Sequence, residues 1–299
     1  MTSDVIGAGT WQLGDLTVNR IGFGAMRLPQ YGQAFAPDAV PRDRDEAIAV
    51  LRRAVELGVN HIDTAAFYFS RLRSANELIA RALAPYPADL IIATKVGPGR
   101  DPGGEWLPMA RPEQLRGQVE ENLRQLGRDH LDLVNLRTSG AGSITEHFGA
   151  LAELRAAGLI RHLGISNGRP EHLAQARAVA PVVCVQNAYG LGYRPGQDAV
   201  VDVCGEQGVA FVPFFAIAGA GREAGTGGAE DGEVLAIARA HEVSPAQIRL
   251  AWALHRGPHV LVIPGTGTTA HLEDNVAAGG VRLGVTELAR LDAVHRTGA

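Results

Sequence analysis

An aspartate, a tyrosine and a lysine in the first third of the chain could together transfer a proton. Each lies at the end of a short apolar run or shortly after one. Asp63 ends the run 60–63, Tyr68 lies five residues further on, and Lys95 follows the run 90–94. A tyrosine hydroxyl has a pKa near 10, and a neighbouring ammonium group would lower that pKa. A carboxylate paired with the lysine would hold the ammonium in place. Tyr68 could then act as a general acid that protonates a carbonyl oxygen as hydride arrives at carbon. The spacing alone equally allows a purely structural Asp63–Lys95 ion pair, with Tyr68 in a loop.

Lys95 is also the only lysine in the chain, although lysine and arginine together number 28 among 299 residues. A chain that uses arginine at every other basic position would be expected to use it here too. The ammonium group is a compact point charge, whereas the guanidinium group is a wide planar fork. The arginine bias itself is typical of the coding preferences of a genome, but if Lys95 lies beside Tyr68, a need for a small charge there would explain the single lysine.

The composition argues against several other classes of protein. The formal net charge is -4, so the chain lacks the basic surplus that is typical of nucleic-acid-binding proteins. The first residues show no secretory signal, and no stretch approaches the ~20 apolar residues that span a membrane. Cys184 and Cys204 have neither metal-ligand spacing nor a disulfide framework, which predicts buried reduced thiols and no metal site. We expect a cytoplasmic protein whose partner is a small molecule.

Short β-branched runs alternate with longer segments of helical period along the chain. A closed (β/α)8 barrel and a doubly wound open sheet both fit this pattern. The open sheet should show a G-x-G-x-x-G turn after its first strand, but residues 22–27 carry only the first two glycines. We therefore predict a single α/β domain over 1–299, a (β/α)8 TIM barrel with a short N-terminal hairpin at residues 11–18. The eight expected strands are 21–25, 60–63, 90–94, 131–136, 160–165, 182–186, 209–214 and 260–263.

A barrel would gather chemistry at one rim, because active sites of this architecture form at the carboxyl ends of the strands. Polar residues end or follow the second to sixth expected strands, in the order Asp63, Lys95, Arg137, Ser166 and Gln186. The glycine-rich segment 219–232 follows the seventh strand and is expected to form a loop on the same face.

Several segments, in order along the chain, carry a resemblance to a known family. They are 58–68 (GVNHIDTAAFY), 92–95 (IATK), 163–167 (LGISN), 185–187 (VQN) and 263–266 (IPGT), the last followed by His271, Leu272 and Asn275. In these segments the chain resembles the aldo-keto reductase superfamily, from about residue 10 to residue 296. The resemblance implies a (β/α)8 barrel that binds NADPH along its rim without a Rossmann fold. It also implies reversible reduction of aldehydes and ketones to alcohols.

The resemblance assigns roles to individual residues. Tyr68 is implied to be the proton donor, Lys95 the cation that tunes it, and Asp63 the carboxylate that orients Lys95. The implied contacts at the nicotinamide end are Gly24 and Met26 near the ribose, Ser166, Asn167 and Gln186 on the carboxamide, and Phe214 stacked on the ring. The implied contacts at the adenosine-phosphate end are Gly265, Thr266, His271 and Asn275, with the loop that includes Gly219 over the pyrophosphate.

Arg137 departs from the family pattern, because the family usually ends this strand with a histidine. Arginine stays charged and cannot act as an acid, but it can hold a carbonyl oxygen and lower the pKa of Tyr68. The alternative is that Arg137 pairs with a carboxylate and leaves the site weak or inactive.

His271 is the second departure, because many relatives that prefer NADPH carry arginine there. Histidine is only partly charged near pH 7. We therefore expect NADPH to be preferred over NADH with weaker discrimination, and NADPH affinity to fall as the pH rises from about 6 to 8.

One branch of the family, the bacterial pyridoxal reductases, is the closest in appearance. The matching segments are 41–44, 106–108, 134–137, 183–187 and 212–215. The branch implies reduction of pyridoxal to pyridoxine with NADPH, and Arg137 could hold the aldehyde oxygen or the neighbouring phenolate. Tyr31 and Trp106, in the loops after the first and third strands, are candidates for lining the substrate opening. A broad-specificity aldehyde or ketone reductase and a weakly catalytic NADP(H)-binding sensor remain alternatives, and the sequence indicates no oligomeric state.

Overall fold

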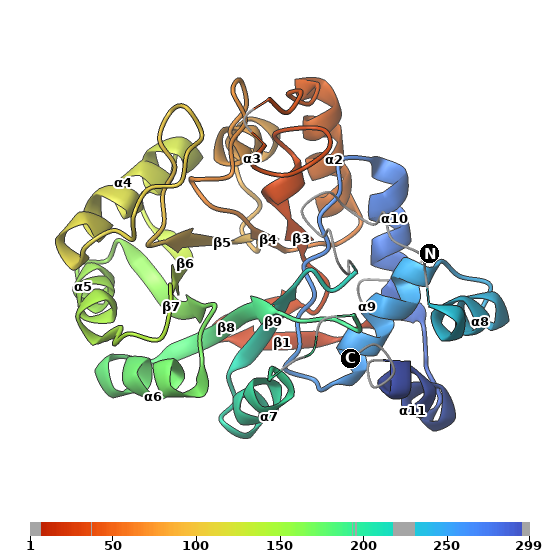
Figure 1. Ribbon diagram of the computed structural model, residues 1–299. Helices are drawn as coiled ribbons and strands as arrows, with labels where there is room; N and C mark the ends of the chain where they lie inside the picture. The colour runs from red at the N-terminus through yellow and green to blue at the C-terminus, as the bar shows by residue number, and fades with distance from the viewer. Residues whose placement is uncertain (1–6, 37, 193, 195, 218–230, 295–299) are drawn as a thin grey trace.

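In the computed structural model, seven parallel strands curl around a common axis and helices surround them (Figure 1). The structure describes residues 7–36, 38–192, 194, 196–217 and 231–294. Neighbouring strands in the sheet are also consecutive along the chain, which is the order of a β/α barrel. The strands are β3 (Phe23–Gly24), β4 (His61–Asp63), β5 (Ile91–Val96), β6 (Leu131–Arg137), β7 (Ile160–Ser166), β8 (Val182–Ala188) and β9 (Ala210–Phe214).

Residues 260–263 close this sheet into a barrel. On one side, the Leu261 N–H donates to the Phe211 carbonyl at 2.9 Å. On the other side, the Val262 N–H donates to the Arg20 carbonyl at 2.9 Å. Because the segment bonds to both edges of the sheet, it acts as the eighth strand. The predicted (β/α)8 barrel is confirmed, and the doubly wound open sheet is excluded.

Helices cover the outside of the barrel, and side chains cap several of them. Asp43 accepts hydrogen bonds from the backbone N–H groups of Asp45 and Glu46 at the start of α2. Ser244 accepts one from the Gln247 N–H at the start of α9. The helices are α2 (Arg44–Glu56), α3 (Ala75–Leu83), α4 (Leu115–Leu126), α5 (Thr145–Ala156), α6 (Pro170–Val179), α7 (Asp198–Glu206), α8 (Gly232–Ala240), α9 (Pro245–His255), α10 (Thr269–Ala277) and α11 (Val285–Val294), with 3-10 turns η1 (Ala25–Arg27), η2 (Pro112–Gln114) and η3 (Ala278–Gly280).

Two apolar clusters form because successive side chains of a strand point alternately to the lumen and to the helices. The outer cluster joins the sheet to the helices and includes Leu51 of α2 and Val134 of β6. The inner cluster lies in the lumen and includes Ile91, Leu133 and Val212. Burial on both faces explains why the strands appear as nearly continuous apolar runs in the sequence.

The predicted N-terminal hairpin is present and packs into the amino-terminal end of the barrel. β1 (Thr10–Leu13) pairs antiparallel with β2 (Leu16–Asn19), and Leu13 belongs to the inner cluster. Asp15, in the turn, accepts a hydrogen bond of 2.7 Å from Arg161 near the start of β7. The hairpin therefore occupies this end of the lumen, which leaves the carboxyl-terminal rim for chemistry.

Both cysteines are free and buried, as predicted. Burial raises the pKa of the Cys184 thiol, and it raises the pKa of Cys204 to about 12. Both thiols are therefore protonated at neutral pH. No helix in the described ranges is long and apolar enough to cross a membrane.

Candidate active site

An ion pair between Lys95 and Asp63 lies inside the carboxyl-terminal end of the barrel. The Lys95 Nζ donates to the two oxygens of Asp63 at 2.7 Å and 2.6 Å, and to the Thr64 carbonyl at 3.0 Å. The side chains of Lys95 and Asp63 are only 2% and 6% exposed. Buried charges persist only when they are paired and well hydrogen-bonded, and here all three ammonium hydrogens have an acceptor. The pairing that was predicted from strand ends is confirmed.

Tyr68 lies beside this pair, but its pKa shifts in the direction opposite to the prediction. The Lys95 Nζ is 4.8 Å from the centre of the Tyr68 ring, and Tyr68 is buried. Burial raises the pKa of Tyr68 above its ordinary value, and the charges of Lys95 and Arg137 only partly offset this effect. The cations act in the expected direction, but the net shift is upward because burial disfavours the tyrosinate more strongly. Tyr68 is a protonated donor throughout the neutral range.

Arg137 ends β6 at the rim, and its guanidinium group is available for a ligand. Its backbone pairs with Ser166 of β7, and its positive charge acts on Tyr68. Within the described ranges, the half-buried Arg137 side chain forms neither a hydrogen bond nor an ion pair. The alternative in which a carboxylate neutralises Arg137 is not seen among these residues.

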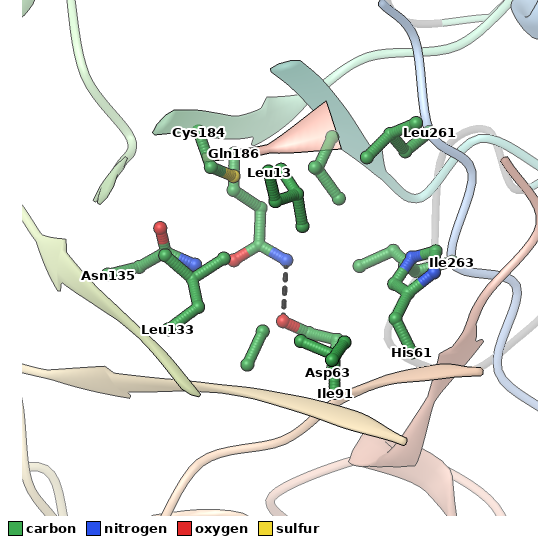
Figure 2. A pocket seen from close by; sticks show the side chains of 12 residues that line it. Leu13, His61, Asp63, Ile91, Leu133, Asn135, Cys184, Gln186, Leu261 and Ile263 are labelled. Atoms are coloured by element: carbon green, nitrogen blue, oxygen red, sulfur yellow. Dashed lines mark hydrogen bonds between the residues drawn. The ribbon is translucent and has the colours of Figure 1, made fainter. Parts of the chain in front are cut away.

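Gln186 of β8 also reaches Asp63, from the other side of the lumen. Its amide nitrogen donates to the Asp63 Oδ1 at 2.7 Å (Figure 2). The Gln186 Oε1 and the Asn135 Oδ1 have no hydrogen-bond partner among the residues that the structure describes. A cavity of about 10 Å³ lies between these side chains, close to the space that one water molecule requires. Gln186 therefore supports the Asp63 carboxylate, a contact that the sequence did not predict.

Ser166 and Asn167 stand at the end of β7, next to Gln186 in the sheet. Ser166 is fully buried, yet its hydroxyl has no hydrogen-bond partner within the described chain. Asn167 has a φ of 56°, a left-handed conformation that asparagine tolerates better than most residues. Phe214 ends β9 and is half-buried. A buried hydroxyl without a partner is unfavourable, so this rim fits a polar group with both donors and acceptors, such as a carboxamide.

Gly24 and Gly265 have a structural reason to be glycine. They lie where β3 meets the end of the eighth strand. A Cβ on Gly24 would approach the Ile263 carbonyl oxygen to 2.6 Å, and one on Gly265 would approach the Gly24 carbonyl oxygen to 2.5 Å. The contact between the first and last strands therefore requires both glycines.

The remaining predicted cofactor residues differ in exposure. Thr266 is buried just before the start of α10, and Asn275 is buried within that helix. His271, in the first turn of α10, is exposed. Met26, in η1, packs against the outer cluster. Gly219 lies outside the described residues.

An aromatic wall, formed by Phe35, Phe67 and Trp106, stands beside Tyr68. The ring centres of Phe67 and Phe35 are 5.2 Å and 5.9 Å from that of Tyr68. Trp106 packs against Phe35 and Phe67 and is 47% exposed. Trp106 thus reaches from solvent to the rings that touch Tyr68, which is the arrangement expected for a residue at the substrate opening.

Tyr31 is not brought into this group. Its ring lies 4.3 Å from the Arg42 guanidinium, and its hydroxyl donates to the Glu46 Oε2 at 2.6 Å. These contacts tie Tyr31 to the start of α2, away from the aromatic wall. Its predicted place at the substrate opening gains no support from the geometry.

The arrangement can pass a proton to an oxygen that gains negative charge. Tyr68 holds the proton, and Lys95 is fixed beside it by Asp63. The Arg137 cation stands at the rim without a partner among the described residues. A model of the aldo/keto reductase family matches residues 20–296, which include every one of these side chains. The chain belongs to the aldo/keto reductase family. It is accordingly an NADP-dependent oxidoreductase.

Relatives of this aldo/keto reductase include two enzymes of Escherichia coli strain K12. A pyridoxine 4-dehydrogenase is 42% identical over 294 residues, which cover 96% of this chain and 98% of that protein. A methylglyoxal reductase is 32% identical over 279 residues, which cover 91% of this chain and 93% of that protein. Among solved structures, an aldo/keto reductase from Klebsiella pneumoniae in complex with NADP and acetate has a TM-score of 0.76 and 26% identity, covering 93% of this chain and 92% of that one.

The predicted site residues leave out two features of this aldo/keto reductase. Phe67 directly precedes Tyr68, and an aromatic pair after a strand could have indicated a wall for a flat substrate. The contact from Gln186 to Asp63 joins residues 123 positions apart. Nothing local in the sequence signals it, because it depends on how far each side chain reaches across the lumen.

Proposed function

We propose that the enzyme reduces pyridoxal, or a similar aromatic aldehyde with a neighbouring anionic oxygen, to the alcohol with NADPH. The observation that carries the proposal is the guanidinium group of Arg137, which has no partner among the described residues and lies close enough to act on Tyr68. A fixed planar cation favours a substrate that places a negative oxygen beside its carbonyl group. The pyridoxine 4-dehydrogenase of Escherichia coli, at 42% identity, supports this substrate class.

The aromatic wall supports a flat substrate. Phe35 and Phe67 present rings within 6 Å of Tyr68, and Trp106 extends the apolar surface to solvent. Aromatic rings pack favourably in offset or edge-to-face arrangements. A heterocyclic aldehyde could lie along this wall while its polar edge faces Arg137.

The residues at the rim fit the nicotinamide end of the cofactor. Ser166 and Gln186 each offer a buried oxygen without a partner among the described residues, and Phe214 offers a ring face. These groups would hold the carboxamide and the ring of NADPH. The NADP complex of the Klebsiella pneumoniae relative supports this cofactor.

In the proposed reaction, bound NADPH supplies the hydride that reduces the aldehyde carbon. The Tyr68 O–H bond breaks as an O–H bond forms on the former carbonyl oxygen. Lys95 stabilises the negative charge left on the tyrosine oxygen, and Asp63 keeps Lys95 in place. Arg137 would orient the substrate by holding its aldehyde oxygen or phenolate.

The function is tested by mixing the protein with NADPH and a panel of aldehydes and following the loss of cofactor absorbance. We expect turnover on pyridoxal well above that on methylglyoxal and simple aliphatic aldehydes. Equal turnover on all of them would instead identify a broad-specificity reductase. Tight NADPH binding without turnover on any aldehyde would contradict the proposal.

An Arg137→His variant is expected to lose about 10-fold or more in kcat/KM for pyridoxal, because hydrogen bonds to charged groups contribute ~1.5–3 kcal/mol. Histidine is only partly charged at neutral pH and presents no planar fork. Pyridine-4-carbaldehyde, which lacks the phenolate, serves as the matched control and should lose less. If the variant keeps full activity on pyridoxal, the proposed contact of Arg137 is wrong.

A further inference from the structure

Arg42 is a buried cation for which the described residues provide no carboxylate. It lies in the loop before α2 and is only 8% exposed. None of the described aspartates or glutamates forms an ion pair with it. Buried arginines are normally paired, because removing a charge from water is costly. We therefore expect Arg42 to bind an anion that is not part of the described chain.

The described residues use only part of the hydrogen-bonding capacity of Arg42. Its Nη1 donates to the Gly267 carbonyl at 3.1 Å, and its Nη2 lies 3.5 Å from the Gln30 carbonyl. Its Nε is buried and has no hydrogen-bond partner within the described ranges. A guanidinium group has five N–H donors, and Tyr31 supports it from one face at 4.3 Å. The group is held in place while several of its donors have no acceptor among the described residues.

The guanidinium group sits directly against the turn that begins α10. A Cβ on Gly267 would come within 2.0 Å of the Arg42 Cζ, so only glycine leaves room for it. The next residue, Thr268, caps α10, and its hydroxyl accepts the His271 N–H at 3.4 Å. The amino-terminal end of a helix carries partial positive charge and free N–H groups, which favour an anion. A buried cation and a helix N-terminus thus meet at one turn.

We propose that Arg42 is the residue that recognises the 2′-phosphate of NADPH and so sets the preference for NADPH over NADH. This inference rests on the proposed function, since it concerns the cofactor of that reaction. It moves the role from His271, which is exposed, to a buried guanidinium group, the side chain that binds phosphate as a permanent cation. The planar guanidinium fork also matches a phosphate group geometrically.

The first test uses Arg42→Met, which keeps an unbranched chain against Tyr31 but removes the charge. Dissociation constants are measured for NADPH, NADH and adenosine 2′,5′-bisphosphate. We expect the variant to bind NADPH and the bisphosphate about 10-fold to 100-fold more weakly and NADH unchanged. Arg44→Met, two residues away on an exposed arginine, is the matched control and should bind all three ligands normally.

The outcomes separate the inference from the proposed function. Unchanged NADPH affinity in Arg42→Met overturns the inference and leaves the proposed function standing. Equal weakening for NADPH and NADH also overturns it, because that result would place the pyrophosphate at Arg42. Failure of the wild-type protein to bind NADPH at all contradicts the proposed function as well.

A measurement on the wild-type protein covers the case in which Arg42→Met does not fold. An arginine side chain stays protonated throughout the neutral range, whereas the second ionisation of a phosphate has a pKa near 6. NADPH affinity should therefore hold or rise between about pH 6 and pH 8. A fall over this range, as the sequence predicted for a contact with His271, would overturn the inference.

Discussion

A Tyr68→Phe variant is expected to lose about 10²-fold to 10⁴-fold in kcat for aldehyde reduction, with NADPH affinity unchanged. The substitution removes only the hydroxyl and keeps the ring that packs against Phe35 and Phe67. Lys95, which lies beside the Tyr68 ring, already directs its ammonium group to Asp63 and Thr64. Cofactor absorbance follows turnover, and fluorescence titration follows NADPH binding.

Tyr86→Phe provides the matched control for the loss of a tyrosine hydroxyl. The Tyr86 hydroxyl donates to the Leu126 carbonyl at 2.7 Å, at the end of α4 and outside the lumen. We expect this variant to keep wild-type turnover. Undiminished turnover in Tyr68→Phe would remove Tyr68 from the mechanism, whatever the result for Tyr86.

The pH dependence gives Tyr68 a second, independent readout. Reduction requires the protonated hydroxyl, and burial raises the pKa of Tyr68 above its ordinary value of 10.0. The donor is therefore present at neutral pH and is lost only as the pH rises through this increased pKa. We expect kcat/KM for reduction to stay level from about pH 7 to pH 10. A loss of activity centred well below pH 10 would contradict the direction of the shift.

The barrel could be predicted because its periodicity is local. Each strand appears as a short apolar run, and the helices between them show their spacing directly in the sequence. The closure of the barrel by residues 260–263 was harder to predict, because it depends on hydrogen bonds from Leu261 and Val262 to opposite edges of the sheet. The missing third glycine after Gly24 had already favoured a barrel over an open sheet.

The partners of Lys95 could also be predicted, because parallel strands bring their carboxyl ends to one rim. The net pKa shift of Tyr68 could not. Its direction depends on the balance between burial and two nearby cations, and the degree of burial is set by side chains such as Phe35 that come from distant loops. The surroundings of Arg42 could not be predicted either, because its hydrogen bond to the Gly267 carbonyl joins residues 225 positions apart.

A Lys95→Arg variant is expected to lose most of its turnover, about 10²-fold or more, because small displacements of catalytic groups have effects of this size. Lys95 places one compact charge against two Asp63 oxygens, the Thr64 carbonyl and the Tyr68 ring. A guanidinium group spreads its charge over a wide plane and cannot meet all of these groups from the same space. The guanidinium group would either draw Asp63 away from Gln186 or place its charge further from Tyr68. Turnover, NADPH affinity and the melting temperature are measured together.

Arg128→Lys tests whether exchanging the two cations is harmful in itself. Arg128 donates to the Asp132 Oδ2 at 2.9 Å, and the two side chains are 16% and 4% exposed, so this pair is also largely buried. Asp132 accepts a hydrogen bond from the Ile92 N–H. It lies on the outer face of the barrel sheet, where no reacting atom is expected. The exchange at position 128 should change stability slightly and turnover little. If Lys95→Arg instead keeps wild-type turnover, the charge beside Tyr68 need not be compact, and the single lysine of the chain has no catalytic explanation.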